Sequence, residues 1–150
     1  MKANRVNALI DHLRAESEPT IVFAVQGGMF SEGVDYPGES VIGAFVVGPP
    51  LPNFDLEREE MRKYYEKHYG AGFEYAYTIP AMAKAVQAAG RVIRSETDRG
   101  LIVLMDGRFV QPDYSRAMPA DWFEHSATEL VSESILKDVS KFWEKDNNNT

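Results

Sequence analysis

Gln87-Ala88-Ala89-Gly90-Arg91-Val92-Ile93-Arg94 is the stretch around which this chain is organised, because its polar residues share one side of a predicted helix. A helix turns by about 100° per residue, so the polar residues of this stretch have nearby angular positions around the helix axis, at roughly 0°, −60°, +40° and −20°. They are, in the same order, Gln87, Gly90, Arg91 and Arg94. Apolar residues cluster on the opposite side: Met82, Val86, Ala89 and Ile93. One face of the helix is therefore predicted to pack, and the other presents two guanidinium groups.

The two arginines suit a phosphate ligand. Arg91 and Arg94 lie one turn apart, and each guanidinium offers a planar fork of donors that keeps its charge. Gly90 costs a helix interior about 1 kcal/mol relative to alanine, so it favours a site where another group approaches the backbone. The alternative is a pair of surface arginines that neutralise nearby acidic side chains.

These residues also carry a resemblance to a known family. Gln87-x-x-Gly90-Arg91-x-x-Arg94 resembles motif VI of the superfamily-two helicases, and its surroundings narrow the resemblance to the XPD/DinG family of DNA helicases. The segment 27–35 resembles motif V of that family and is followed by a similar Tyr36-Pro37-Gly38. The segment 98–109 resembles the strand and the Asp-x-Arg-Phe signature that follow motif VI. The resemblance runs from about residue 22 to residue 122, in the expected order and spacing.

Three continuous apolar runs predict strands that are buried on both faces, as in parallel sheets: 21–25, 41–47 and 101–105. Helices are predicted between and around them, so the chain is predicted to have an α/β fold. The resemblance implies a RecA-like parallel sheet flanked by helices, a P-loop NTPase-like helicase C-terminal domain truncated at its N-terminal edge. Residues 1–145 are expected to form this domain, and 146–150 a polar tail.

The region before the organising stretch is harder to interpret. Asp55 is expected to cap a helix over about 56–69, which Gly70 closes. The alternating segment 73–77 permits a short strand, after which Thr78 is expected to cap the next helix. Its tyrosines are interpreted as packing residues, with stacking on nucleic-acid bases as the alternative.

A glycine-rich loop over 26–38 follows the first predicted strand. Glycine lets backbone N–H groups approach an anion closely, so the loop is interpreted as an anion-binding loop. The alternative interpretation is a glycine-rich turn whose acidic side chains are solvated. The resemblance implies that Asp35 accepts a hydrogen bond from the nucleotide ribose and that Gly33 permits the close approach. It also marks Glu32 as a nucleotide-site position and implies that Ser31 contacts a DNA phosphate.

Composition narrows the functional classes. The chain has 150 residues and a net charge of −7, which argues against nucleic-acid binding through bulk positive charge and leaves only local contacts. It has no cysteine, and its three histidines lack zinc-ligand spacing, so no metal site is expected in the chain itself. Neither a signal peptide nor a membrane span is recognisable, so we expect no membrane partner and a cytoplasmic location, or the nucleoid or nucleus.

The chain contains no G-x-x-x-x-G-K-[ST] phosphate loop, so it is not expected to hydrolyse ATP alone. The resemblance implies that ATP with Mg²⁺ binds between this domain and an N-terminal phosphate-loop motor domain. Arg94 and Arg91 would then reach the γ-phosphate, and Gln87 would sense it. The cycle would step the domain along single-stranded DNA. The family's iron–sulphur cluster needs cysteines of the other motor domain and is not in this chain.

The resemblance suggests a role in DNA repair, and two other functions stay open. One is a non-catalytic nucleic-acid-binding module. The other is a protein-interaction module, because the corresponding domain of XPD docks a regulatory subunit in a larger repair complex. DNA binding that weakens steeply with salt would favour the former.

Overall fold

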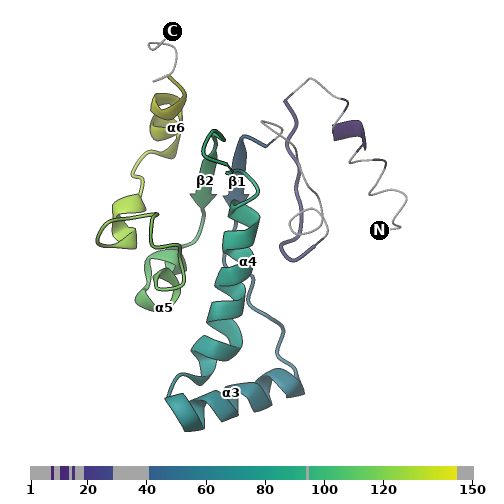
Figure 1. Cartoon of the computed structure of the whole chain (residues 1–150), viewed down its shortest axis with the longest axis vertical. Coiled ribbons are helices and arrows are strands. Elements are labelled where there is room, and N and C mark those ends of the chain that lie inside the picture. The colour runs from purple at the N-terminus through teal and green to yellow at the C-terminus, as the bar shows by residue number, and fades with distance from the viewer. Residues whose placement is uncertain are drawn as a thin grey trace.

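The computed structural model describes residues 8, 11–13, 15, 19–28, 41–93 and 95–144 (Figure 1). Its elements follow one another as β1 (Gly43–Val46), α3 (Leu56–Tyr69), the π-helix η2 (Glu74–Thr78), α4 (Ile79–Ala89), β2 (Leu101–Leu104), the 3₁₀-helix η3 (Gly107–Val110), α5 (Pro112–Ser115), the 3₁₀-helix η4 (Ala127–Leu130) and α6 (Ile135–Glu144). None of the helices in the described ranges has both the length and the hydrophobicity that a membrane span requires.

β1 and β2 form a parallel pair, in which Gly43 lies opposite Leu101 and Val46 opposite Leu104. α3, η2 and α4 form the crossover that joins them, as a parallel connection requires. The predicted strands over 41–47 and 101–105 are thus confirmed, although each is shorter. A small parallel sheet with helices is consistent with a RecA-like α/β fold.

The predicted strand over 21–25 is not found. These residues form no ladder, and the side chains of Ile21, Phe23 and Val25 are 82–94% exposed. An apolar run becomes a strand only where a neighbour supplies hydrogen bonds and other layers cover its faces. Among the described residues, β1 pairs with β2 alone.

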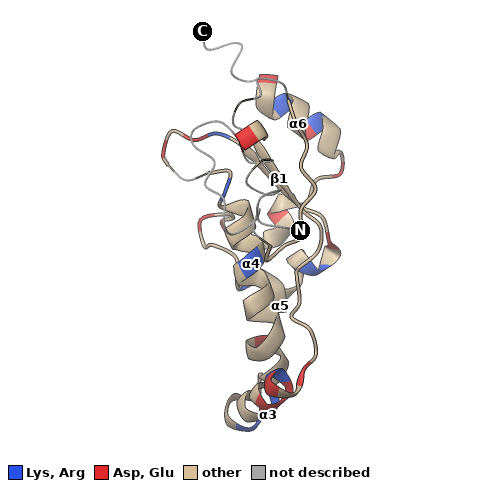
Figure 2. Cartoon of the chain, turned by 90° about the vertical axis from the view of Figure 1, so that its right-hand side faces the viewer, with Lys and Arg blue, Asp and Glu red and all other residues tan. Residues whose placement is uncertain are grey.

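α3 has the predicted bounds and the predicted ends. The carboxylate of Asp55 accepts a hydrogen bond from the backbone N of Arg58 at 2.7 Å, which caps the first turn. Gly70 closes the helix with φ 65°, a left-handed conformation that favours glycine. Acidic and basic residues both lie along α3 (Figure 2).

The segment predicted as a short strand over 73–77 is instead helical, and it widens into the π-helix η2. Thr78 therefore does not cap α4: it has helical backbone angles and makes no side-chain cap. Contacts with α3 stabilise this conformation. The hydroxyl of Tyr77 donates to Glu59 Oε1 at 2.6 Å, and Arg58 Nη1 donates to the carbonyl of Ala76 at 3.1 Å.

The core lies between β1, α4 and the segment that follows β2. Its buried residues are Val46, Met82, Ala85, Phe109, Tyr114, Met118 and Ala127. α4 runs beside β1, and α3 crosses the end of α4 that lies away from the sheet (Figure 1). α6 is the last helix of the described residues, and the guanidinium of Arg99 lies over the ring of its Phe142, 4.6 Å from the ring centroid.

Candidate functional site

The organising stretch is only partly helical. α4 ends at Ala89, and the backbone N–H groups of Arg91 and Val92 donate three residues back, to Ala88 and Ala89. Such bonds tighten the chain into a turn, so the prediction that the helix continues through Arg91 is wrong. This change of direction buries Val92, which is 2% exposed.

Three of the predicted phosphate-site residues are described. Gln87 is exposed in the last turn of α4, and Arg91 is half-buried in the turn that follows. Gly90 is exposed and lies at the C-cap with φ −64° and ψ −1°, so it does not occupy the predicted helix interior. Any residue adopts these angles, so its backbone conformation does not require glycine. Arg94 lies outside the described residues.

The turn that holds Arg91 packs against the start of β1 through Gly100. A Cβ atom on Gly100 would lie 2.1 Å from Val92 Cγ1 and 3.1 Å from the carbonyl oxygen of Ile42. The N–H of Leu101 donates to that same oxygen at 2.9 Å. Sequence reasoning gave Gly100 no role; its position between a polar turn and an apolar run was the available signal.

This contact brings together two segments that are distant in sequence. Ile42 comes after the glycine-rich loop in sequence and directly before β1, so the turn that contains Arg91 and Val92 lies beside the start of β1. The predicted nucleotide and DNA residues of the loop lie outside the described residues: Ser31, Glu32, Gly33 and Asp35. Arg91 is therefore at the amino ends of β1 and β2.

A second polar cluster lies at the carboxyl ends of the strands. Asp106 Oδ1 accepts from the backbone N and from Nε of Arg108, at 2.8 and 3.0 Å, and Oδ2 accepts from Nη2 at 2.8 Å. These hydrogen bonds from Arg108 lower the pKa of Asp106 to about 2. Phe109 is buried in the core. The Asp-x-Arg-Phe signature thus forms an internal ion pair and a packing anchor.

Gly48 lies against this ion pair. It has φ 74°, and an added Cβ would lie 3.3 Å from Asp106 Oδ2 and 3.4 Å from Arg108 Nη2. The side-chain N–H of Gln26 donates to the carbonyl of Gly48 at 2.9 Å. The first residue of the glycine-rich loop is therefore hydrogen-bonded to the segment that follows β1.

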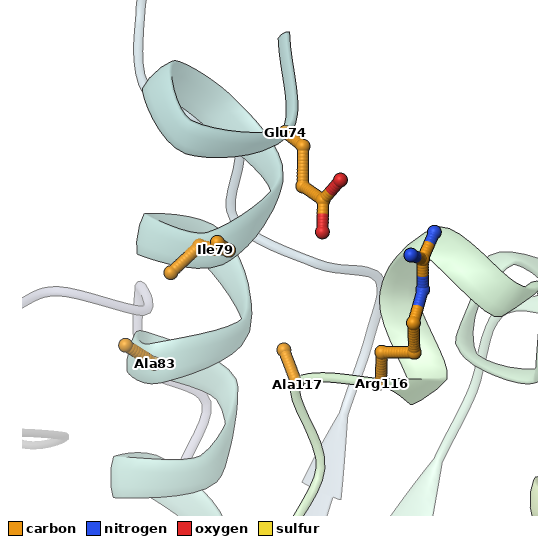
Figure 3. Close-up of a pocket in the computed structure, with 5 residues that line it drawn as sticks. All are labelled: Glu74, Ile79, Ala83, Arg116 and Ala117. Atoms are coloured by element: carbon orange, nitrogen blue, oxygen red, sulfur yellow. The ribbon is translucent and has the colours of Figure 1, made fainter. Parts of the chain in front are cut away.

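A shallow depression lies elsewhere, between the start of α4 and α5 (Figure 3). Glu74 and Arg116 face it from opposite sides, but the guanidinium of Arg116 is already paired with Asp113 at 2.8 Å. It contains none of the predicted site residues. Within the described ranges, no three acidic or histidine side chains gather as a metal site would require.

The chain is similar to known DNA helicases. The family model described as helicase C-terminal domain matches residues 2–125. Fanconi anemia group J protein homolog of Gallus gallus is 35% identical over 102 residues, which are 64% of this chain and 8% of that protein. ATP-dependent DNA helicase chl-1 of Caenorhabditis elegans is 29% identical over 129 residues, which are 85% of this chain and 16% of that protein. ATP-dependent DNA helicase DinG of Photobacterium profundum is 34% identical over 103 residues, which are 67% of this chain and 14% of that protein. The chain thus spans 8–16% of the length of these three relatives.

Proposed function

Because this chain belongs to the helicase C-terminal domain family, we propose that it is the second motor domain of an ATP-dependent DNA helicase of the XPD/DinG type. The observation that carries the proposal is the packing of Val92 against Gly100, on whose other side lies the carbonyl of Ile42. This contact supports a position for Arg91 near the start of β1, the strand that follows the motif V-like segment 27–35 in sequence.

ATP would bind between this domain and a partner domain that carries the phosphate loop. Arg91 and Arg94 would contact the γ-phosphate, and Gln87 would sense its presence. Gln87 and Gly90 are both exposed, so a partner domain has access to this end of α4. In phosphoryl-transfer enzymes, an arginine supplied in this way contributes about 10³–10⁵ in rate.

The glycine-rich loop would hold the remaining part of the nucleotide. Asp35 would accept a hydrogen bond from the ribose, with Gly33 and Glu32 beside it, and Ser31 would contact a DNA phosphate. The partner domain would supply the phosphate loop and the ligands for Mg²⁺, since this chain contains no such loop. Loss of the γ-phosphate removes charge that the arginines contact, so the domains would separate and step along single-stranded DNA. We assign this motor to DNA repair.

The test uses the assembled helicase, in which this domain is joined to its phosphate-loop domain. Arg91→Lys and Arg94→Lys should each lower ATP turnover by about 10³-fold, because an ammonium cannot reproduce the planar fork. The melting temperature should be unchanged. The control is Arg116→Lys on α5, which replaces an exposed arginine away from Arg91 and should turn over ATP normally. Normal turnover in both arginine variants of the site would refute the proposed role.

A further inference from the structure

Five aromatic rings form one continuous surface over the C-terminal half of α3 and the start of η2. Neighbouring ring centroids lie 4.2–6.3 Å apart, and the pairs Tyr64–His68 and Tyr65–Tyr75 are stacked. We call this surface the aromatic array; it consists of Tyr64, Tyr65, His68, Tyr69 and Tyr75.

The array is not part of the hydrophobic core. Tyr64, Tyr69 and Tyr75 are 54%, 64% and 43% exposed, whereas Tyr77 is fully buried. The packing interpretation therefore holds for Tyr77, while Tyr75 packs one face on Tyr65 and leaves much of its ring in solvent. Ring faces in contact with water are available to a planar ligand.

Positive charge borders the rings. Lys67 lies between the array residues Tyr64 and Tyr69 in sequence and makes no ion pair with any residue that the structure describes. Lys63 pairs with Glu60 at 2.7 Å, but both side chains are 61% exposed, so this pair is weak. The carboxylate of the neighbouring Glu66 accepts a hydrogen bond from the N–H of Gly72. Two lysines are thus available to phosphates next to exposed ring faces.

We propose that the aromatic array binds single-stranded DNA, with bases stacked on the rings of Tyr64 and Tyr69 and phosphates contacted by Lys63 and Lys67. Aromatic rings beside cations are the usual platform for unpaired bases, because every base has a flat face.

This inference rests on the proposed function, since it adds a DNA contact to the motor domain. It concerns a different part of the molecule. The array lies where α3 crosses the far end of α4, whereas Arg91 follows the other end of that helix (Figure 1). Eleven helical residues separate the two ends, which corresponds to about 16 Å.

The experiment is a titration of the full chain against a fluorescently labelled oligothymidylate and against an abasic oligonucleotide of the same length. Tyr64→Ala and Tyr69→Ala should each weaken oligothymidylate binding by about 5- to 100-fold and leave binding of the abasic strand unchanged. Tyr69→Phe, which keeps the ring, should bind as the wild type does. Leu56→Ala, which shortens an exposed side chain at the start of the same helix, should also have no effect.

A second measurement locates the contact directly. Ultraviolet cross-linking with an iodouracil-substituted strand, followed by peptide mapping, should label Tyr64 or Tyr69. Circular dichroism confirms that each variant is folded. Unchanged DNA binding in both alanine variants would overturn the proposal. If Ser31→Ala abolished binding in that case, the DNA contact of the proposed function would stand without the array.

Two further outcomes would also overturn it. Failure of the wild-type chain to bind either strand would exclude the array as a DNA platform. Loss of self-association in the alanine variants, with DNA binding intact, would identify the array as a protein-docking surface. In each case the turnover of the Arg91 variant decides independently whether the motor function holds.

Discussion

Because Gly100 has no side chain, Val92 can pack against it, and the candidate site depends on this contact. Val92 Cγ1 occupies the space that a Cβ atom would need, and the carbonyl of Ile42 closes the other side. Any larger residue would separate the turn that holds Arg91 from the start of β1. The glycine is therefore required by packing rather than by backbone conformation.

We predict that Gly100→Ala destabilises the chain by about 1–3 kcal/mol, because the added methyl group overpacks a buried contact. Urea denaturation at neutral pH measures the loss. Gly107→Ala is the matched control, since nothing lies within 4 Å of the position of its Cβ. Equal stability of the two variants would contradict the packing role of Gly100.

Tyr77 is the residue that couples α3 to η2. Burial of the ring and its hydrogen bond to Glu59 raise the pKa of Tyr77 from its ordinary value of 10.0 to about 12. Both causes favour the neutral hydroxyl, so the folded state holds this proton more tightly than the unfolded state does. The resulting stability is present below pH 10 and is lost as the pH rises towards 12.

Tyr77→Phe should therefore be less stable than the wild type at pH 7, because Glu59 loses a charge-assisted hydrogen bond. The difference in urea midpoint should shrink between pH 10 and pH 12, where the wild type alone loses this contribution. Comparing the two proteins at each pH cancels the titration of other groups. A difference that stayed constant up to pH 12 would show that the hydroxyl contributes only by packing.

At the scale of elements, the carboxyl ends of β1 and β2 are joined by the backbone hydrogen bond from the N–H of Met105 to the carbonyl of Val46, and an ion pair follows directly after β2. Asp106 caps η3 and pairs with Arg108, and Gly48 passes beneath them in a left-handed conformation. The pKa of Asp106 is lowered from 3.8 to about 2, so its contribution to stability is present above pH 3.8 and is lost as the pH falls towards 2.

Asp106→Asn should accordingly lower the stability of the chain at pH 7, with the difference from the wild type shrinking between pH 4 and pH 2. Urea denaturation across this pH range measures the effect. Asp113→Asn serves as control, because its ion pair with Arg116 is 61–71% exposed and should contribute little at any pH. A loss at pH 7 that persisted unchanged at pH 2 would assign the effect of Asp106 to shape instead of charge.

Elements also differ in how far local sequence specified them. α3 has the predicted bounds because its two ends are encoded locally, by Asp55 at the N-cap and Gly70 at the C-cap. α4 continues from η2 without a side-chain cap, and it ends at its C-cap Gly90, which was predicted to lie inside the helix. Its last turn is set by the burial of Val92, which depends on Gly100 and Ile42.

At the scale of the whole molecule, apolar residues divide into those the fold covers and those it leaves in solvent. Phe109 is 2% exposed in the core, whereas Phe23, in the segment predicted as a buried strand, is 94% exposed. The two residues have the same chemistry, so their environments alone determine what each contributes.

We predict that Phe109→Ala destabilises the isolated chain by about 3–5 kcal/mol, whereas Phe23→Ala changes its stability by less than about 0.5 kcal/mol. Thermal or urea denaturation measures both. A large loss for Phe23→Ala would mean that the segment over 21–25 is buried in solution, as the sequence pattern predicted.

The sequence by itself predicted the family, strands within 41–47 and 101–105 and the bounds of α3, and it named phosphate-site candidates that stay a prediction. It could do so because continuous apolar runs, capping residues and motif spacing are each contained within a short stretch of chain. Only the tertiary structure decided that α4 ends at Ala89, that 74–78 widen into a π-helix and that 21–25 form no strand. It alone placed Arg91 next to the start of β1. These outcomes depend on free volume and hydrogen-bond partners that residues distant in sequence supply, and no local pattern contains that information.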